Sequence, residues 1–147
     1  MELKKLMVDV KEVWVDFPGL HGFKVKVANL SRKELTNLRK RCTVQKFDRK
    51  TRQVVETLDE DKFVSEFSAA VIKGWEGLTL EHLETILLIE TEGKDMSEEL
   101  PYTIDNAEVL VSSSTEFDTW LNEVVFDLDN FRTDRDRGPS AETGEAV

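Results

Sequence analysis

The side chains that most often carry out chemistry are few and scattered in this chain of 147 residues. His21 and His82 are the only histidines, and neither has a cysteine or a second ligand close to it in the sequence. Zinc sites use ligands at short, regular spacings, so this distribution disfavours a metal centre. Cys42 is the only cysteine, and its basic neighbours could lower its pKa. Because no histidine stands near Cys42, we interpret it as a small apolar core residue.

Three further segments invite a chemical interpretation, and each has a simpler one. Asp127–Asp134 has acidic and amide side chains spaced like calcium ligands, but Phe131 and Arg132 occupy the places of a ligand and of the required glycine. Asp59–Asp61 opens a predicted helix, where negative charge interacts favourably with the helix dipole. Gly74–Gly77 is not followed by the Gly-Lys-Ser/Thr of a phosphate loop. We therefore predict no enzyme, metal or cofactor, and an acidic metal-dependent enzyme is the least favoured alternative.

Length and composition suit one domain with a sizeable core and a heavily solvated surface, since 39% of residues are hydrophobic and 34% are charged. The longest apolar runs are four residues, Ala69–Ile72 and Ile86–Ile89. A membrane-spanning helix needs roughly 18–20 residues. Met1–Lys5 does not lead into the apolar core of a signal peptide, and a single cysteine fits a reducing compartment. The sequence therefore predicts a cytosolic protein with no membrane partner.

The net charge of −10 divides unevenly along the chain. Residues 1–57 hold 14 basic and 7 acidic side chains, a balance of +7, whereas residues 58–147 hold 6 and 23, a balance of −17. One interpretation is that both halves carry solvated faces; the other is that the acidic half attracts a basic partner. Nucleic acid is disfavoured because the basic cluster in residues 32–52 contains only Phe47 as an aromatic residue for stacking on bases.

The N-terminal third has the alternating pattern of β-strands. Apolar residues alternate with polar ones in Val8–Val10 and, after a change of phase at Lys11–Glu12, in Val13–Phe17. The turn residues of Pro18–Gly22 follow, and then Phe23–Val27 alternates again. We therefore predict an antiparallel pair of strands here.

A helix and a second hairpin are predicted next. Ser31–Glu34 has the form of a capping box, and the helix that it opens buries Leu35 and Leu38. Thr43–Phe47 and Gln53–Thr57 then flank the polar turn Asp48–Arg52, which is typical of a hairpin, and the charged residues of the turn indicate an exposed loop.

From Asp59 the apolar residues recur with the period of an α-helix. The first predicted helical face comprises Phe63, Phe67, Ala70, Val71 and Gly74. Leu80–Leu87 and a helix capped by Thr103 are predicted to follow. The final helix has a stripe of Phe117, Trp120, Leu121, Val124 and Leu128. Residues 1–132 are thus predicted to form one α+β domain, with antiparallel strands before a helical C-terminal half, and residues 133–147 a disordered tail.

Three segments of the C-terminal half carry a resemblance to a known family. Gly74–Leu78 reads Gly-Trp-Glu-Gly-Leu at the end of a helical pattern, and Pro101–Asn106 begins Pro-Tyr-Thr and ends in Asn. Phe117–Val125 then opens a closing amphipathic helix. In this order, with Phe17–Gly19 (Phe-Pro-Gly) and Leu30–Arg32 (Leu-Ser-Arg) upstream, the chain resembles the tail assembly chaperones of long-tailed bacteriophages.

The resemblance implies a protein of the host cell cytoplasm that binds the tape measure protein, keeps this long apolar chain soluble, and helps to recruit tail tube protein. It implies no active site. The chain departs from the family pattern by the additional apolar segment Leu80–Ile89, which could be an added helix or a partner-binding element.

The candidate partner-binding residues are Trp75, Leu83, Leu87, Phe117 and Trp120. The two tryptophans are either core aromatics or anchors at a partner surface, where tryptophan contributes disproportionately. The alternative function is a structural virion protein, such as a minor tail or head–tail connector subunit.

Overall fold

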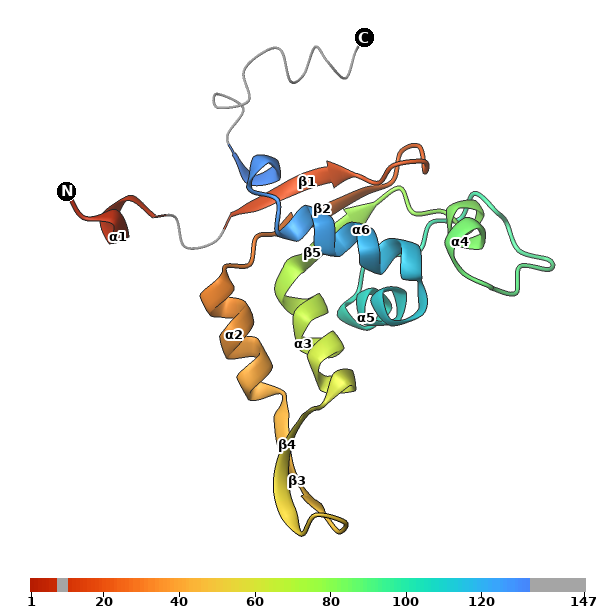
Figure 1. Ribbon diagram of the computed structural model, residues 1–147. Helices are drawn as coiled ribbons and strands as arrows, with labels where there is room; N and C mark the ends of the chain where they lie inside the picture. The colour runs from red at the N-terminus through yellow and green to blue at the C-terminus, as the bar shows by residue number, and fades with distance from the viewer. Residues whose placement is uncertain (8–10, 133–147) are drawn as a thin grey trace.

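The computed structural model describes residues 1–7 and 11–132 (Figure 1). In chain order the elements are α1 (Leu3–Leu6), β1 (Glu12–Asp16), β2 (Lys24–Ala28), α2 (Arg32–Arg41), β3 (Thr43–Asp48), β4 (Gln53–Leu58), α3 (Glu60–Val71), β5 (Ile72–Glu76), α4 (Leu80–Ile86), α5 (Ile104–Ser113), α6 (Thr115–Val125) and the 3-10 helix η1 (Leu128–Phe131). The predicted α+β class, with antiparallel strands before the helices, is confirmed. The strand predicted at Val8–Val10 and the tail predicted at residues 133–147 lie outside the described residues.

The centre of the fold is an antiparallel sheet in the order β1-β2-β5. β1 pairs with β2 as the alternating pattern predicts, with Val13 opposite Val27 and Val15 opposite Val25. The turn between them is closed where the Phe17 amide donates to the Phe23 carbonyl oxygen at 3.0 Å. The valines of β2 are completely buried, so this strand supplies the middle of the core.

The third strand, β5, corrects the prediction that a helical face continues as far as Gly74. α3 ends at Val71, and the chain becomes extended from Ile72 without an intervening loop. Ile72 and Trp75 are both buried and lie opposite two buried valines of β2. The second edge of β2 has backbone donors and acceptors that need partners away from water. A strand satisfies these backbone groups and a continued helix would not. Pairing with β2 therefore overrides the helical period of the sequence in this segment.

The core lies between this sheet and the helices α3, α5 and α6. Its helical contributors are Phe67 and Val71 of α3, Ala107, Leu110 and Val111 of α5, and Phe117, Trp120, Leu121, Val124 and Val125 of α6. Aromatic rings join α6 to the turn after β1, since the ring centroid of Phe17 lies 4.9 Å from Trp120 and 5.9 Å from Phe117. Contacts of this kind add to the burial of apolar area.

The last helix is shorter than its apolar stripe predicts. α6 ends at Val125, and Asp127 caps the separate η1 turn by accepting a hydrogen bond from the Asp129 amide at 3.0 Å. An aspartate side chain that bonds to the backbone in this way competes with helix continuation. Leu128, which we predicted in the stripe, is therefore 67% exposed, while Phe131 returns to the core.

A hairpin extends away from this body. α2 and α3 lie side by side, and Figure 1 shows β3 and β4 projecting beyond their ends. The predicted capping box of α2 is confirmed, because the Ser31 hydroxyl accepts from the Glu34 amide and the Glu34 carboxylate accepts from the Ser31 amide, both at 3.1 Å. The predicted second hairpin is also confirmed, with Phe47 opposite Val54. We call residues 43–58 the arm.

The base of the arm is fixed by contacts between α2 and α3. Arg41 Nε donates to Glu66 Oε1 at 3.0 Å, and Cys42 Sγ donates to Glu66 Oε2 at 3.4 Å. The hydrogen bond from Arg41, followed by that from Cys42, lowers the pKa of Glu66. Burial, followed by the bond to Glu66, raises the pKa of the Cys42 thiol. Cys42 is fully buried, which agrees with its interpretation as a core residue.

A candidate peptide-binding groove

The structure places four of the five candidate partner-binding residues in the interior. Trp75, Leu83, Phe117 and Trp120 are buried, and only Leu87 is partly exposed. The indole Nε1 of Trp75 donates to the carbonyl oxygen of Leu100 at 2.9 Å, so its polar group already has a partner inside the fold. The two tryptophans therefore occupy the core, which was one of the two interpretations of the sequence.

Leu87 lies just after α4, a helix whose start is firmly held. The Thr79 hydroxyl accepts from the His82 amide at 3.2 Å and caps α4. Nδ1 of His82 lies 2.9 Å from the Gly77 carbonyl oxygen and 3.3 Å from the Thr79 amide nitrogen. In the tautomer that carries a hydrogen on Nδ1, this atom donates to the Gly77 carbonyl oxygen. In the other tautomer it accepts a hydrogen bond from the Thr79 amide. His82 thus has a structural role at the start of this helix.

The segment after α4 folds back onto the beginning of the same helix. The Leu80 amide donates to the Glu98 carbonyl oxygen at 2.9 Å, and the Leu100 amide donates to the Leu78 carbonyl oxygen at 2.7 Å. A carboxylate oxygen of Glu99 accepts from the Gly77 amide at 2.9 Å. These bonds close the loop of residues 87–100 at its base and hold the loop against α4.

A groove of about 380 Å³ lies between α4, this loop and α5. Its apolar lining is Leu80, Leu83, Leu87, Ile89, Leu100, Pro101, Val109 and Leu110. Its charged lining is Glu90, Lys94, Glu98 and Glu99. Val109 is 56% exposed, so the apolar lining reaches the surface of α5. The groove thus combines an apolar floor with a mostly acidic rim.

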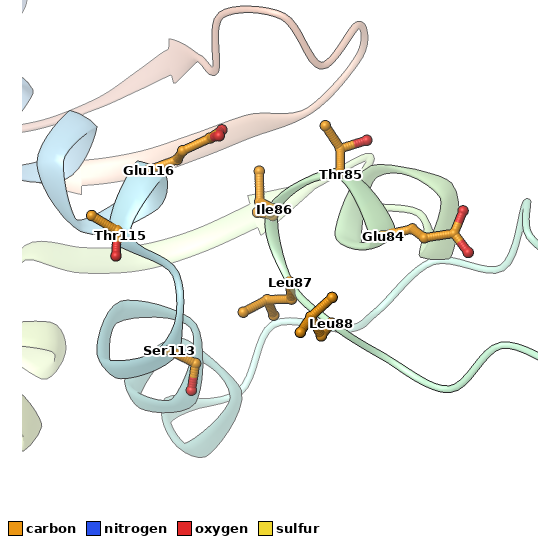
Figure 2. A pocket seen from close by; sticks show the side chains of 8 residues that line it. All are labelled: Glu84, Thr85, Ile86, Leu87, Leu88, Ser113, Thr115 and Glu116. Atoms are coloured by element: carbon orange, nitrogen blue, oxygen red, sulfur yellow. The ribbon is translucent and has the colours of Figure 1, made fainter.

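A second hollow of about 560 Å³ adjoins the first, because Leu87 lines both. Figure 2 shows its two sides: the end of α4 with Leu87 and Leu88, and the α5–α6 junction with Ser113, Thr115 and Glu116. The Leu88 side chain is fully exposed. Both hollows lie beside Leu87, and we call the two together the α4 groove.

The α4 groove lies in a strongly acidic part of the protein. Residues 80–99 contain seven Asp or Glu and one Lys, a net charge of −6. In its loop, hydrogen bonds from the hydroxyl and the amide of Ser97 lower the pKa of Asp95. A groove with this field favours peptides with basic side chains beside their apolar ones.

Among residues 1–7 and 11–132, no three His, Cys, Asp or Glu side chains are grouped as metal ligands. The Tyr102 hydroxyl, whose pKa is raised by burial, donates to the Ile72 carbonyl oxygen at 2.9 Å. None of the helices in these residues has the length and the apolar composition of a membrane span.

Sequence reasoning identified Leu87 and missed the exposed residues around it. Leu88 and Ile89 belong to the apolar run Ile86–Ile89, and four consecutive apolar residues cannot all face one side of a helix. That run was the available signal for an exposed apolar residue. Val109 gave no such signal, because its exposure depends on how α5 is oriented against α3 and α6. Comparisons with protein-family models, with curated proteins and with solved structures found no significant match to this chain.

Proposed function

We propose that this protein is a tail assembly chaperone, which holds the tape measure protein in the host cell cytoplasm and helps to bring tail tube protein to it. The observation that supports the proposal is the α4 groove, an apolar surface with an acidic rim. A client that is long, helical and apolar needs a surface on which it can bury side chains before the tail forms. One side of the groove is formed by Leu80–Ile89, the segment by which this chain departs from the family pattern.

The size and lining of the groove suit an amphipathic helix. Helical clients place anchors at positions i, i+3, i+4 and i+7 in an apolar groove. The hollow between α4, the 87–100 loop and α5 has a volume of about 380 Å³, which is near the lower end of ligand pockets, roughly 300–1,000 Å³. It accommodates one or two such anchors, and the adjoining hollow at Leu88 extends the apolar contact. The acidic rim then pairs with Lys or Arg beside the anchors and keeps the complex soluble.

Co-expression tests the proposal directly. The tape measure protein moves from the pellet to the soluble fraction when this protein is present in excess, and the two proteins co-purify. Leu87→Asp with Leu88→Asp abolishes this effect, because the carboxylates would be buried against apolar client side chains. Leu128→Asp is the control for Leu88→Asp, since Leu128 is, like Leu88, an exposed leucine and lies in η1, away from the groove. Urea titration of the double variant confirms that it folds, because Leu87 is partly buried.

Two results contradict the proposal. One is a client that stays insoluble with the wild-type protein in excess. The other is mass spectrometry of finished particles that finds this protein in abundance, which favours the structural role of a minor tail or head–tail connector subunit. Faster association at low salt than at high salt is expected in addition, because the field of the acidic rim is screened by ions.

A further inference from the structure

The strand β1 is an outer strand of the central sheet, because β2 is the only strand that pairs with it among the described residues (Figure 1). The Phe17 amide donates to the Phe23 carbonyl oxygen, so the backbone groups of the odd-numbered residues of β1 point to β2. In an antiparallel pair this direction alternates from one residue to the next. The amides and carbonyl oxygens of Glu12, Trp14 and Asp16 therefore point to the open edge of the sheet.

These edge groups have no hydrogen-bond partner in the described part of the chain. Within residues 1–7 and 11–132, no backbone or side-chain group bonds to the amide or carbonyl oxygen of Glu12, Trp14 or Asp16 at this edge. In the other outer strand, β5, the Tyr102 hydroxyl already donates to the Ile72 carbonyl oxygen. Donors and acceptors that recur at every second residue of a strand match the backbone of another extended segment.

The side chains of β1 present two different faces to such a segment. Val13 and Val15 pack against the core but are only partly buried. Glu12, Trp14 and Asp16 lie on the outer face, and Trp14 is 49% exposed. Neighbouring strands share their faces, so an added strand places alternate side chains beside the valines and the others opposite the two carboxylates.

The sequence of β2 shows which side chains suit these two faces. β2 reads Lys-Val-Lys-Val-Ala and places Lys24 opposite Asp16 and Lys26 opposite Trp14. Its valines lie opposite the valines of β1. Lys26 Nζ also lies 3.4 Å from a carboxylate oxygen of Glu12. The same alternation of basic and apolar residues is complementary to the open edge of β1, because opposite charges across two strands are favourable.

The charges of β1 disfavour a second copy of this chain at the same edge. An antiparallel pair of two β1 strands centred on Trp14 would place Glu12 of each copy opposite Asp16 of the other. Like charges directly opposite each other destabilise a pair of strands. Charged side chains on an edge strand commonly protect a sheet from pairing with itself. The chemistry of the edge therefore fits a different chain.

We infer that β1 accepts an extended segment of another protein as an antiparallel fourth strand, with Lys or Arg opposite Glu12 and Asp16 and apolar residues opposite the valines of β1. The backbone bonds supply affinity in this mode of recognition, and the alternating side chains supply specificity. The site uses no residue of the α4 groove, so the inference does not rest on the proposed function.

A short peptide gives the first test. The probe is a blocked peptide Lys-Val-Lys-Val-Lys, and the readout is the two-dimensional amide NMR spectrum of the isotope-labelled full-length protein. The peptide shifts the amide signals of Glu12, Trp14 and Asp16 most strongly, with a dissociation constant of about 1 mM or lower. A wild-type protein whose β1 signals do not move at millimolar peptide overturns the inference.

Methylated peptides test the backbone half of this interface. In the antiparallel arrangement the amide of the middle lysine donates to β1, whereas the amide of a valine points away from it. Methylation of the lysine amide nitrogen weakens binding at least about tenfold. Methylation of a valine amide nitrogen is the matched control and leaves most of the affinity. Equal effects of the two methylations contradict strand addition.

A charge exchange tests the side-chain half. Glu12→Lys with Asp16→Lys no longer binds the basic peptide and binds the peptide Glu-Val-Glu-Val-Glu instead, which the wild type does not bind. Glu81→Lys with Glu84→Lys is the matched control, since it makes the same change of charge at exposed residues of α4 and binds the basic peptide as the wild type does. Dispersed amide signals in the same spectra show that each variant is folded.

The same spectra distinguish other occupants and other sites. If the basic peptide shifts the signals of residues 80–99 and only the α4 variant loses it, the peptide binds the acidic groove and the inference is wrong. If the β1 signals move with protein concentration in the absence of peptide, a second copy occupies the edge and the inference is overturned. Peptide binding at β1 together with a client that stays insoluble on co-expression supports the inference and contradicts only the proposed chaperone function.

Discussion

Gly77 joins β5 to α4, and replacing it with alanine tests the packing that holds the α4 groove. Its φ of +75° is favourable only for glycine, and a Cβ at this position would lie 2.0 Å from the Gly22 carbonyl oxygen. A left-handed conformation costs alanine about 1–2 kcal/mol, partly offset by about 0.4–1 kcal/mol from the restricted unfolded chain. Displacing the Gly22 backbone adds about 1–3 kcal/mol, by comparison with overpacked cores. We expect Gly77→Ala to lower the free energy of unfolding by about 2–4 kcal/mol.

Gly93→Ala is the matched control for this prediction. Gly93 has nearly the same φ, +74°, but nothing lies within 4 Å of the position of its Cβ. This variant therefore carries the backbone cost alone, and we expect a loss of about 1 kcal/mol or less. Urea titration of both variants with linear extrapolation measures the difference. If Gly77→Ala loses no more stability than Gly93→Ala, the close approach of Gly77 to Gly22 does not contribute and the reasoning is refuted.

The remaining predictions concern the core and the base of the arm. Trp120→Ala lowers the free energy of unfolding by roughly 3–5 kcal/mol in urea titration, since it leaves a cavity beside Phe17; a loss below about 1 kcal/mol would contradict its burial. Arg52 has a φ of +57°, a conformation that a β-branched residue adopts least readily, so Arg52→Val accelerates amide exchange in β3 and β4. The depressed pKa of Glu66 means that its ionised form is favoured in the folded state. Its contribution is thus present above the unfolded pKa of about 4.5 and is lost as pH falls through the lower folded pKa, so the stability deficit of Glu66→Gln shrinks in acid. Cys42, buried and with a raised pKa, reacts with iodoacetamide at about pH 7 only as fast as the chain opens, and rapid labelling of the folded protein would contradict this.

Sequence patterns predicted the elements that depend on local features, such as the alternation of apolar residues or a helix cap. The β1–β2 pair follows from strict alternation, and α2 follows from the capping box at Ser31. β5 could not be predicted in this way, because Ile72 and Trp75 also fit the helical face of α3. What makes this segment a strand is the unfilled edge of β2, which is a tertiary requirement. The end of α6 was missed for a local reason, the capping side chain of Asp127.

The candidate site was less predictable than the fold. The apolar residues of a predicted helix show which face is hydrophobic. They do not show which residues of that face the tertiary packing leaves exposed. Leu83, Leu87 and Phe117 all belong to apolar helical patterns in the sequence. Leu83 and Phe117 are buried, whereas Leu87 reaches the surface because of how α4 lies against α6 and the 87–100 loop. Exposure was predicted correctly for the turn of the second hairpin, where the charged residues indicate an exposed loop.

The arm also affects how the stability of this protein should be measured. Its cross-strand hydrogen bonds lie between two solvated faces, whereas those of β1, β2 and β5 belong to the core. Amide protons of β3 and β4 therefore exchange with solvent through local opening, and those of β2 exchange only when the whole domain unfolds. A thermal melt followed by tryptophan fluorescence reports on Trp14, Trp75 and Trp120, none of which lies in the arm. An arm that has melted and an arm that is intact give the same melting curve, and only residue-resolved exchange distinguishes them.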